Sequence, residues 1–215
     1  MIIYLHGFAS SPKSRKAQVF QEGFAAKGVR IEVPDLAQGD FEHLTITGQL
    51  RVIDRLAQGR PVSLIGSSMG GYLAALYASR HPEVQKLFLM APAFHFPQTW
   101  ATTLGPERVA EWKRTRKLMT FHYGEQREVP LDYGIVEDGA QYEAAPSFHQ
   151  PALVFHGTHD TVVPATYSVE YAQSHPNVTL QLVESGHELT DVLDELWRAG
   201  SRFLLEGETE AFQGA

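Results

Sequence analysis

Three polar residues of the sequence have the types and the chain order of a nucleophile, an acid and a base. Ser68 lies in Gly66-Ser67-Ser68-Met69-Gly70, between an apolar run and a helix-forming stretch. Asp160 and His187 each follow a later apolar run. A serine hydroxyl becomes nucleophilic when a base takes its proton, and a carboxylate orients a histidine for that task. Together the three residues predict acyl transfer.

Neighbouring residues compete for two of these roles. Ser67 is not preceded by a glycine two positions earlier, as the Gly-x-Ser-x-Gly turn requires. Among the carboxylates, Asp191 is expected inside the final helix, Asp35 follows a different strand, and Asp138 belongs to a stretch that matches no motif. We therefore predict that Asp160 is the acid.

Acyl transfer also needs two N–H donors for the negative charge that develops on the carbonyl oxygen. Met69 follows the nucleophile and begins a helix, whose N-terminus is electropositive. The loop after the first strand offers a second donor at Phe8. We expect the backbone N–H groups of Phe8 and Met69 to form an oxyanion hole.

The elements that must position these residues are short apolar strands alternating with amphipathic helices. Strands are expected at residues 2–5, 29–33, 62–65, 86–90, 152–155 and 179–183. Helices are expected at about 12–27, starting at Pro12 with Ser11 as its cap, and at 47–57, 69–80 and 190–205. This alternation predicts an α/β fold with a doubly wound, mainly parallel six-stranded sheet in the order 2-1-3-4-5-6. The switch point of such a sheet places Phe8 beside Ser68.

A single domain is expected over residues 1–215, interrupted by an insertion at about 92–150. The insertion should contain a charged helix near 106–117 and a hairpin of strands 118–123 and 127–131 around Gly124. At the carboxyl end of a strand it would act as a lid or cap. Residues 206–215 contain little to bury and are expected to form a flexible tail.

Composition excludes several classes of function. The chain has no cysteine, a net charge of -7 and no apolar run of membrane-spanning length. We expect no nucleic-acid partner, no membrane insertion and a cytoplasmic location. The group His156-x-x-His159-Asp160 lacks the helical spacing of a metalloprotease motif, so no metal is expected. His6, His156 and His159 are interpreted as residues that shape loops.

Two features of the insertion each have two interpretations. Its aromatic residues form either an acyl pocket or a small core of their own: Phe94, Phe96, Trp100, Trp112, Phe121 and Tyr123. The basic run 113–117 is either a solvated helix face or a contact for an anionic group such as a coenzyme A phosphate.

The start of the chain, Ile3-Tyr4-Leu5-His6-Gly7-Phe8-Ala9-Ser10-Ser11-Pro12-Lys13-Ser14, resembles the short bacterial YqiA-like esterases. The segments around Ser68, Asp160 and His187 resemble the nucleophile, acid and histidine blocks of the α/β-hydrolase superfamily. This resemblance covers the sheet and leaves residues 92–150 unmatched. It implies an abbreviated fold without the two N-terminal antiparallel strands of larger relatives. It also implies hydrolysis of a small-molecule ester or thioester through an acyl-enzyme, without a cofactor.

Other functions stay open on the same residues. The fold and the three side chains do not fix the leaving group, so peptide-bond or carbon–carbon bond hydrolysis are alternatives. A different class is a non-catalytic binding protein on a hydrolase scaffold, in which Ser68 is a turn residue and His187 a solvated loop residue. The retention of all three side chains argues against this class.

Overall fold

The architecture is a parallel six-stranded sheet covered on both faces by helices. We describe it from a computed structural model over residues 1–205, except for the side chains of residues 97, 98, 101 and 102. In spatial order the strands of the sheet are β2 (Ile31–Glu32), β1 (Ile2–Leu5), β3 (Val62–Ser67), β4 (Val84–Met90), β7 (Ala152–Gly157) and β8 (Val178–Val183). All five pairings in this sheet are parallel. The predicted fold class and strand order are therefore confirmed.

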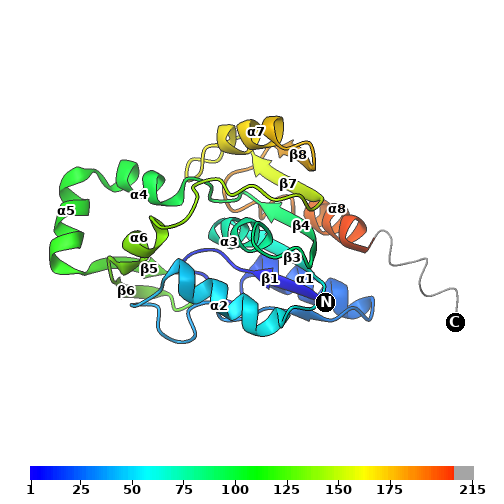
Figure 1. Cartoon of the computed structure of the whole chain (residues 1–215), viewed down its shortest axis with the longest axis horizontal. Coiled ribbons are helices and arrows are strands. Elements are labelled where there is room, and N and C mark those ends of the chain that lie inside the picture. The colour runs from blue at the N-terminus through cyan, green and yellow to red at the C-terminus, as the bar shows by residue number, and fades with distance from the viewer. Residues whose placement is uncertain (206–215) are drawn as a thin grey trace, which may run out of the picture.

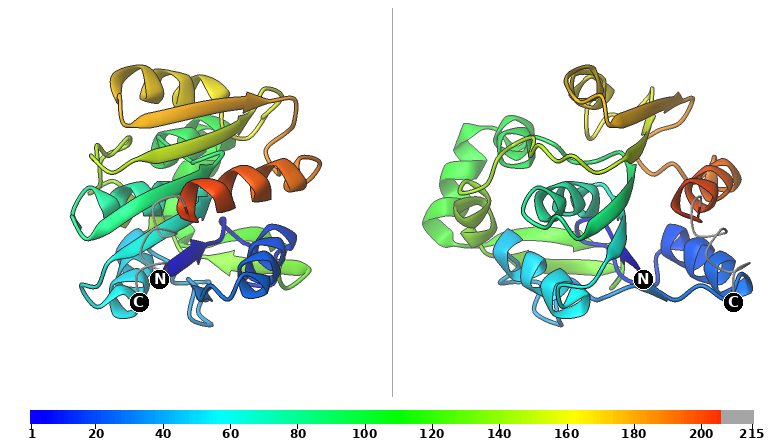
Figure 2. Two further views of the ribbon diagram at one scale, coloured as in Figure 1. Left: turned by 90° about the vertical axis from the view of Figure 1, so that its right-hand side faces the viewer. Right: turned by 45° about the vertical axis from the view of Figure 1, so that its right-hand side comes forward.

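The helices divide between the two faces of the sheet (Figures 1 and 2). One face is covered by α1 (Arg15–Ala26) and α8 (Leu193–Leu205), which contact each other. The other is covered by α2 (Ile46–Ala57), α3 (Met69–Ala78) and α7 (Ala165–Ser174). Because successive side chains of a strand alternate between faces, both faces of the central strands are buried. In β1, Ile3 and Leu5 join one apolar core, whereas Ile2 and Tyr4 join the other.

The segment between β4 and β7 carries its own elements, which gather at one end of the molecule (Figure 1). They are α4 (Phe96–Leu104), α5 (Pro106–Thr115), β5 (Leu118–His122), β6 (Arg127–Leu131) and α6 (Gly134–Gly139). β5 and β6 form the predicted antiparallel hairpin, with Leu118 opposite Leu131. The buried Trp112 indole N–H donates to the Leu131 carbonyl at 2.8 Å, which holds α5 against the hairpin.

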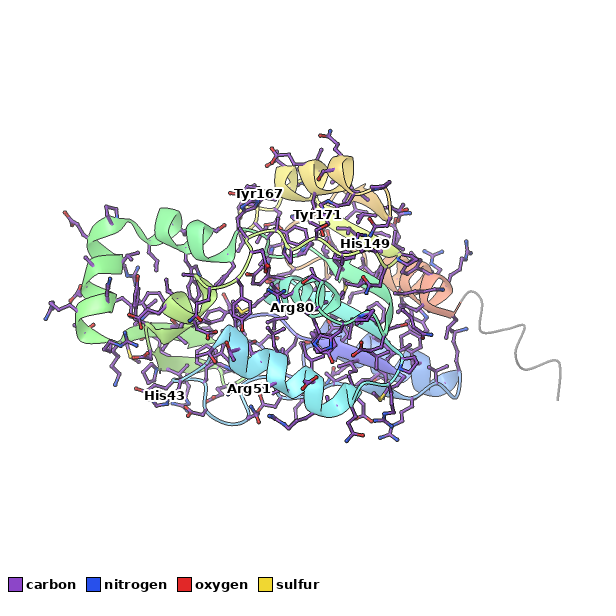
Figure 3. The ribbon with its side chains drawn as sticks, in the orientation of Figure 1. His43, Arg51, Arg80, His149, Tyr167 and Tyr171 are labelled. Atoms are coloured by element: carbon purple, nitrogen blue, oxygen red, sulfur yellow. The ribbon has the colours of Figure 1, made fainter. Side chains whose placement is uncertain are left out.

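The return of this segment to the sheet is fastened by side chains of the main fold. Arg80, at the end of α3, donates to the Glu143 carboxylate at 2.5 Å and lies over the Tyr142 ring. Tyr171 of α7 donates its hydroxyl to the Pro146 carbonyl at 2.6 Å. Figure 3 labels Arg80, which lies just after α3, and Tyr171 of α7. The insertion therefore packs directly against the main fold.

Several boundaries differ from the sequence prediction. The first helix starts at Arg15 and not at Pro12, because the Ser14 hydroxyl caps it by accepting from the Ala17 N–H. The second strand is shorter than predicted, and the last helix starts at Leu193. The predicted tail at 206–215 lies outside the described residues.

Candidate active site

Ser68 occupies a sharp turn between β3 and α3. Its backbone has φ 54° and ψ -117°, a strained conformation for a residue with a side chain. The flanking glycines make this turn possible, because a Cβ at Gly66 would lie 2.4 Å from Gly70 O and one at Gly70 would lie 2.0 Å from Leu5 O. The turn is thus pressed against the end of β1, and Ser68 is presented at the carboxyl edge of the sheet.

The structure brings the three predicted residues together. His187 Nε2 accepts from the Ser68 hydroxyl at 2.9 Å, and His187 Nδ1–H donates to Asp160 Oδ2 at 2.7 Å. The Asp160 carboxylate is fully buried and the His187 side chain is 13% exposed. This geometry permits a proton to pass from Ser68 to His187 while Asp160 holds the ring in one tautomer.

Asp160 is held by more partners than the sequence indicates. Its Oδ1 accepts from the Val162 and Val163 N–H groups at 2.8 Å each. Its Oδ2 also accepts from His156 Nε2–H at 3.1 Å, so two histidines share one oxygen. Burial favours the neutral acid, but the hydrogen bonds from His156 and His187 outweigh it and hold the pKa of Asp160 below its usual range.

His156 was expected only to shape a loop, and its contact with Asp160 adds a direct link to the site. The ring is fully buried at the end of β7. It also contacts the Val163 carbonyl at 3.0 Å and the Ser168 hydroxyl of α7 at 2.7 Å. The signal in the sequence was its position four residues before Asp160, which could not show that it contacts that carboxylate.

The rival carboxylates have other partners. The Asp191 carboxylate accepts from the Ser185 hydroxyl in the loop that carries the histidine. Asp35 accepts from backbone N–H groups of its own turn. Asp138 binds the Thr47 N–H and hydroxyl at the start of α2. Among these candidates, the structure brings Asp160 alone to His187.

The loop after β1 lies beside Ser68. A Cβ added to Gly7 would be 3.5 Å from Ser68 Cβ. The Phe8 N–H and the Met69 N–H donate to no acceptor in the described part of the chain. Met69 sits at the first position of α3, so its N–H is one of the free donors at a helix start. Both predicted oxyanion-hole donors therefore lie next to Ser68 and have no protein acceptor within residues 1–205.

Three hydrogen bonds hold the loop that follows β1 in place. His6 Nδ1–H donates to the Gly7 carbonyl at 2.9 Å, and its Nε2 accepts from the Leu36 N–H. Burial lowers the pKa of His6, which favours this neutral form. From the other side, the Tyr123 N–H at the tip of the hairpin donates to the Ala9 carbonyl at 2.8 Å. The insertion thus braces the loop that carries Phe8.

A cavity of about 700 Å³ opens beside Ser68 and His187. From the insertion it is lined by Tyr123 and Gly124. The other aromatic residues of the insertion do not line it: Phe94, Phe96 and Trp112 are buried in the core, Trp100 packs on Phe8, and Phe121 is exposed. Nor does the basic run 113–117 reach the cavity, and its Arg116 pairs with Asp132 and Glu137.

Within residues 1–205 no three His, Cys, Asp or Glu side chains gather as a metal site would require. The helices described there are too short or too polar to span a membrane. His159 is exposed, and its side chain forms no hydrogen bond or ion pair with Asp160 or His156.

A doubly wound parallel sheet with a serine on a strand–helix turn, followed by an acid and a histidine after later strands, defines the α/β-hydrolase fold. The chain shares this fold with Est1E from Butyrivibrio proteoclasticus, solved with ferulic acid bound (TM-score 0.81, 21% identity, 97% of this chain and 89% of that one). It is also similar to mouse alpha/beta hydrolase domain-containing protein 10 (TM-score 0.78, 21% identity, 94% and 88%) and to Paleococcus ferrophilus monoacylglycerol lipase (0.74, 17%, 95% and 93%).

The chain belongs to UPF0227, described as an uncharacterised protein family, whose model matches residues 1–203. This confirms the resemblance to the YqiA-like proteins and to the α/β-hydrolase superfamily. Among curated proteins, mouse monoacylglycerol lipase ABHD6 is 32% identical over 104 residues. That match spans 43% of this chain and 30% of the mouse protein.

Proposed function

We propose that this protein is a serine hydrolase that cleaves carboxylic esters or thioesters of small molecules through an acyl-enzyme. The observation that carries the proposal is the chain of two hydrogen bonds from Ser68 to His187 and from His187 to Asp160. The esterase and lipase named among the proteins of similar fold support the same class of reaction.

The reaction follows from the positions of these groups. His187 takes the proton of the Ser68 hydroxyl as its oxygen attacks the carbonyl carbon. The carbonyl oxygen becomes an oxyanion, which accepts from the Phe8 and Met69 N–H groups. His187 then gives its proton to the leaving alcohol or thiol, and the acyl group stays on Ser68. Water, deprotonated by His187, attacks this acyl-enzyme and releases the acid and Ser68.

The insertion contributes one wall of this site. The hairpin tip at Tyr123 and Gly124 lines the cavity and braces the loop of Phe8. We propose that it caps one side of the substrate, as a small lid does.

Labelling with a fluorophosphonate probe tests the mechanism directly, because such probes react with serines that a histidine activates. We expect an adduct on Ser68 in the folded wild-type protein and none in Ser68→Ala. Hydrolysis of p-nitrophenyl butyrate should fall by at least about 10³-fold in Ser68→Ala. An unlabelled wild-type protein would instead support a binding protein on a hydrolase scaffold.

Leaving-group alternatives are tested on the same enzyme. A series of p-nitrophenyl esters, thioesters and peptide p-nitroanilides should be hydrolysed with esters or thioesters fastest. A preference for the anilides would move the assignment to a peptidase. Preferred hydrolysis of a β-diketone would move the assignment to a hydrolase of carbon–carbon bonds.

A further inference from the structure

The wall of the cavity formed by the start of α1 and the loop before it carries an excess of positive charge. Lys13, Arg15 and Lys16 line it from the loop before α1 and from its first turn, against a single carboxylate, Glu188. The chain as a whole has a net charge of -7, so the sign at this wall is opposite to that of the protein. Lys13 and Arg15 are exposed, and neither side chain forms an ion pair within residues 1–205.

Lys16 is the unusual member of this group because it is buried. Its residue is 8% exposed, and its Nζ donates to the Glu188 carbonyl at 2.6 Å, beside His187. Burial lowers the pKa of the Lys16 ammonium, and the charges of Glu188 and Asp160 oppose that change. An ammonium has three donors, and among residues 1–205 Lys16 has one protein acceptor and no carboxylate within salt-bridge distance. A buried cation of this kind is costly unless an anion accompanies it.

The N-terminus of α1 adds to the positive electrostatic potential at this wall. The N-terminus of α1 is the positive end of its dipole, where acidic residues are favourable and basic ones are not. The first turn of α1 nevertheless contains Arg15 and Lys16 and no acidic residue. The arrangement opposes helix stability and is therefore consistent with a role in binding.

A second, independent donor lies at the same cavity. The Tyr4 side chain is fully buried and lines the cavity, and its hydroxyl has no hydrogen-bond partner in the described residues. Burial raises the pKa of Tyr4; the nearby Ser14 hydroxyl opposes this, but the two groups do not reach hydrogen-bonding geometry. A buried hydroxyl without a partner costs free energy that a ligand acceptor would recover.

We propose that this wall binds an anionic group of the substrate, a carboxylate or a phosphate, with Lys16 as its main ligand. The site then prefers esters that carry a negative charge a few atoms from the carbonyl attacked by Ser68. The substrate class rests on the proposed ester hydrolysis, whereas anion binding at the wall does not.

Two ester substrates of matched length test the preference. p-Nitrophenyl hemiglutarate carries a terminal carboxylate, and p-nitrophenyl pentanoate is its neutral counterpart. In the wild type we expect kcat/KM for the charged ester to exceed that for the neutral one by roughly tenfold or more, as a charge-assisted contact provides. In Lys16→Gln, which keeps a donor for Glu188 O and removes the charge, this ratio should fall by about tenfold.

Three further variants separate the local charge from other effects. Glu188→Gln removes the opposing charge and should raise the ratio, and Lys13→Gln should lower it by a few-fold at an exposed position that folding does not need. Lys113→Gln removes an equal charge from the surface of α5, away from the cavity, and should leave the ratio and both rates unchanged. If Lys16→Gln slows both esters by the same factor, Lys16 acts through the His187 loop and the proposal is wrong.

A binding measurement tests anion binding at this wall independently of ester hydrolysis. Thermal unfolding of Ser68→Ala protein, with and without Lys16→Gln, is compared in sodium phosphate, sodium glutarate and sodium chloride at equal ionic strength. We expect phosphate or glutarate to raise the Tm when Lys16 is present and not in Lys16→Gln; which anion does so identifies the group. If neither anion raises the Tm and the ester ratio is near one, the inference fails even where Ser68 is labelled. If the anions bind while Ser68 is unlabelled, it is the hydrolase proposal that fails.

Discussion

The substitution Gly70→Ala tests whether catalysis depends on close packing between the turn of Ser68 and the loop of Phe8. A Cβ there would lie 2.0 Å from Leu5 O and 2.7 Å from His6 O. Real Cβ atoms keep at least 3.0 Å from such atoms, and both neighbours here are backbone. α3 and the end of β1 must therefore move apart by about 1 Å, which is the kind of overpacking that cores resist.

That movement would separate the two proposed oxyanion donors, because Met69 moves with α3 and Phe8 moves with the chain after β1. A misplacement of about 1 Å at a catalytic group costs on the order of 10²-fold in rate, close to the loss of one oxyanion donor. We expect kcat/KM of Gly70→Ala for p-nitrophenyl butyrate to fall by about 10²-fold. Stability should fall by about 1–3 kcal/mol in urea unfolding.

The matched control is Gly186→Ala, next to His187. A Cβ at Gly186 would meet nothing within 4 Å, so this variant changes a glycine near the site without forcing the chain apart. We expect it to retain kcat/KM within about threefold of the wild type. A folded Gly70→Ala protein with a rate equally close to the wild type would refute the reasoning, since the contact would then be relieved without moving either donor.

Two more predictions concern the acid and the hairpin. Because the pKa of Asp160 is held below its ordinary value of 3.8, the stability that its charge contributes is complete above that value and is lost as the pH falls. Urea unfolding between about pH 5 and pH 2.5 should therefore lose stability more steeply in the wild type than in Asp160→Asn, and parallel curves would contradict this. Tyr123→Pro removes the N–H that donates to Ala9 O and should lower kcat for p-nitrophenyl butyrate by about tenfold, whereas Tyr123→Ser keeps it and should not. Equal kcat values for the two variants would show that this hydrogen bond does not position Phe8.

The sheet and the candidate triad could be predicted from the sequence because their signals are local. Each strand is a short apolar run, and each proposed catalytic side chain follows one of them within a few residues. The carboxyl ends of parallel strands share one edge, so the positions of Ser68, Asp160 and His187 in the chain already predict that they meet.

Helix starts were less predictable because similar local patterns compete. Ser11 followed by Pro12 matches a cap and first position as well as Ser14 followed by Arg15 does. The structure uses Ser14, whose hydroxyl accepts from Ala17, and places Ser11 in the preceding turn. The choice depends on how the loop of Phe8 packs, which no short pattern contains.

Contacts between distant segments were beyond the sequence argument. Lys16 reaches Glu188 across 172 positions of the chain, and its burial has no local signature. The one available signal was two basic residues at a helix start without an acidic neighbour. His156 likewise looked like a loop residue, because its contact with Asp160 depends on how the turn after β7 folds back.

The residues that line the cavity differ in chemistry, and this difference bears on the substrate. Tyr123 of the hairpin tip and Val162 of the loop after β7 line the cavity, and these residues are 66% and 56% exposed. On the α1 side the cavity presents cations and hydroxyls around Lys16. A substrate whose carbonyl lies at Ser68 could contact Tyr123 or Val162 with an apolar portion and the start of α1 with an anionic group. Because the hairpin also braces the loop of Phe8, changes to the insertion should alter the rate of the chemical step as well as the choice of substrate.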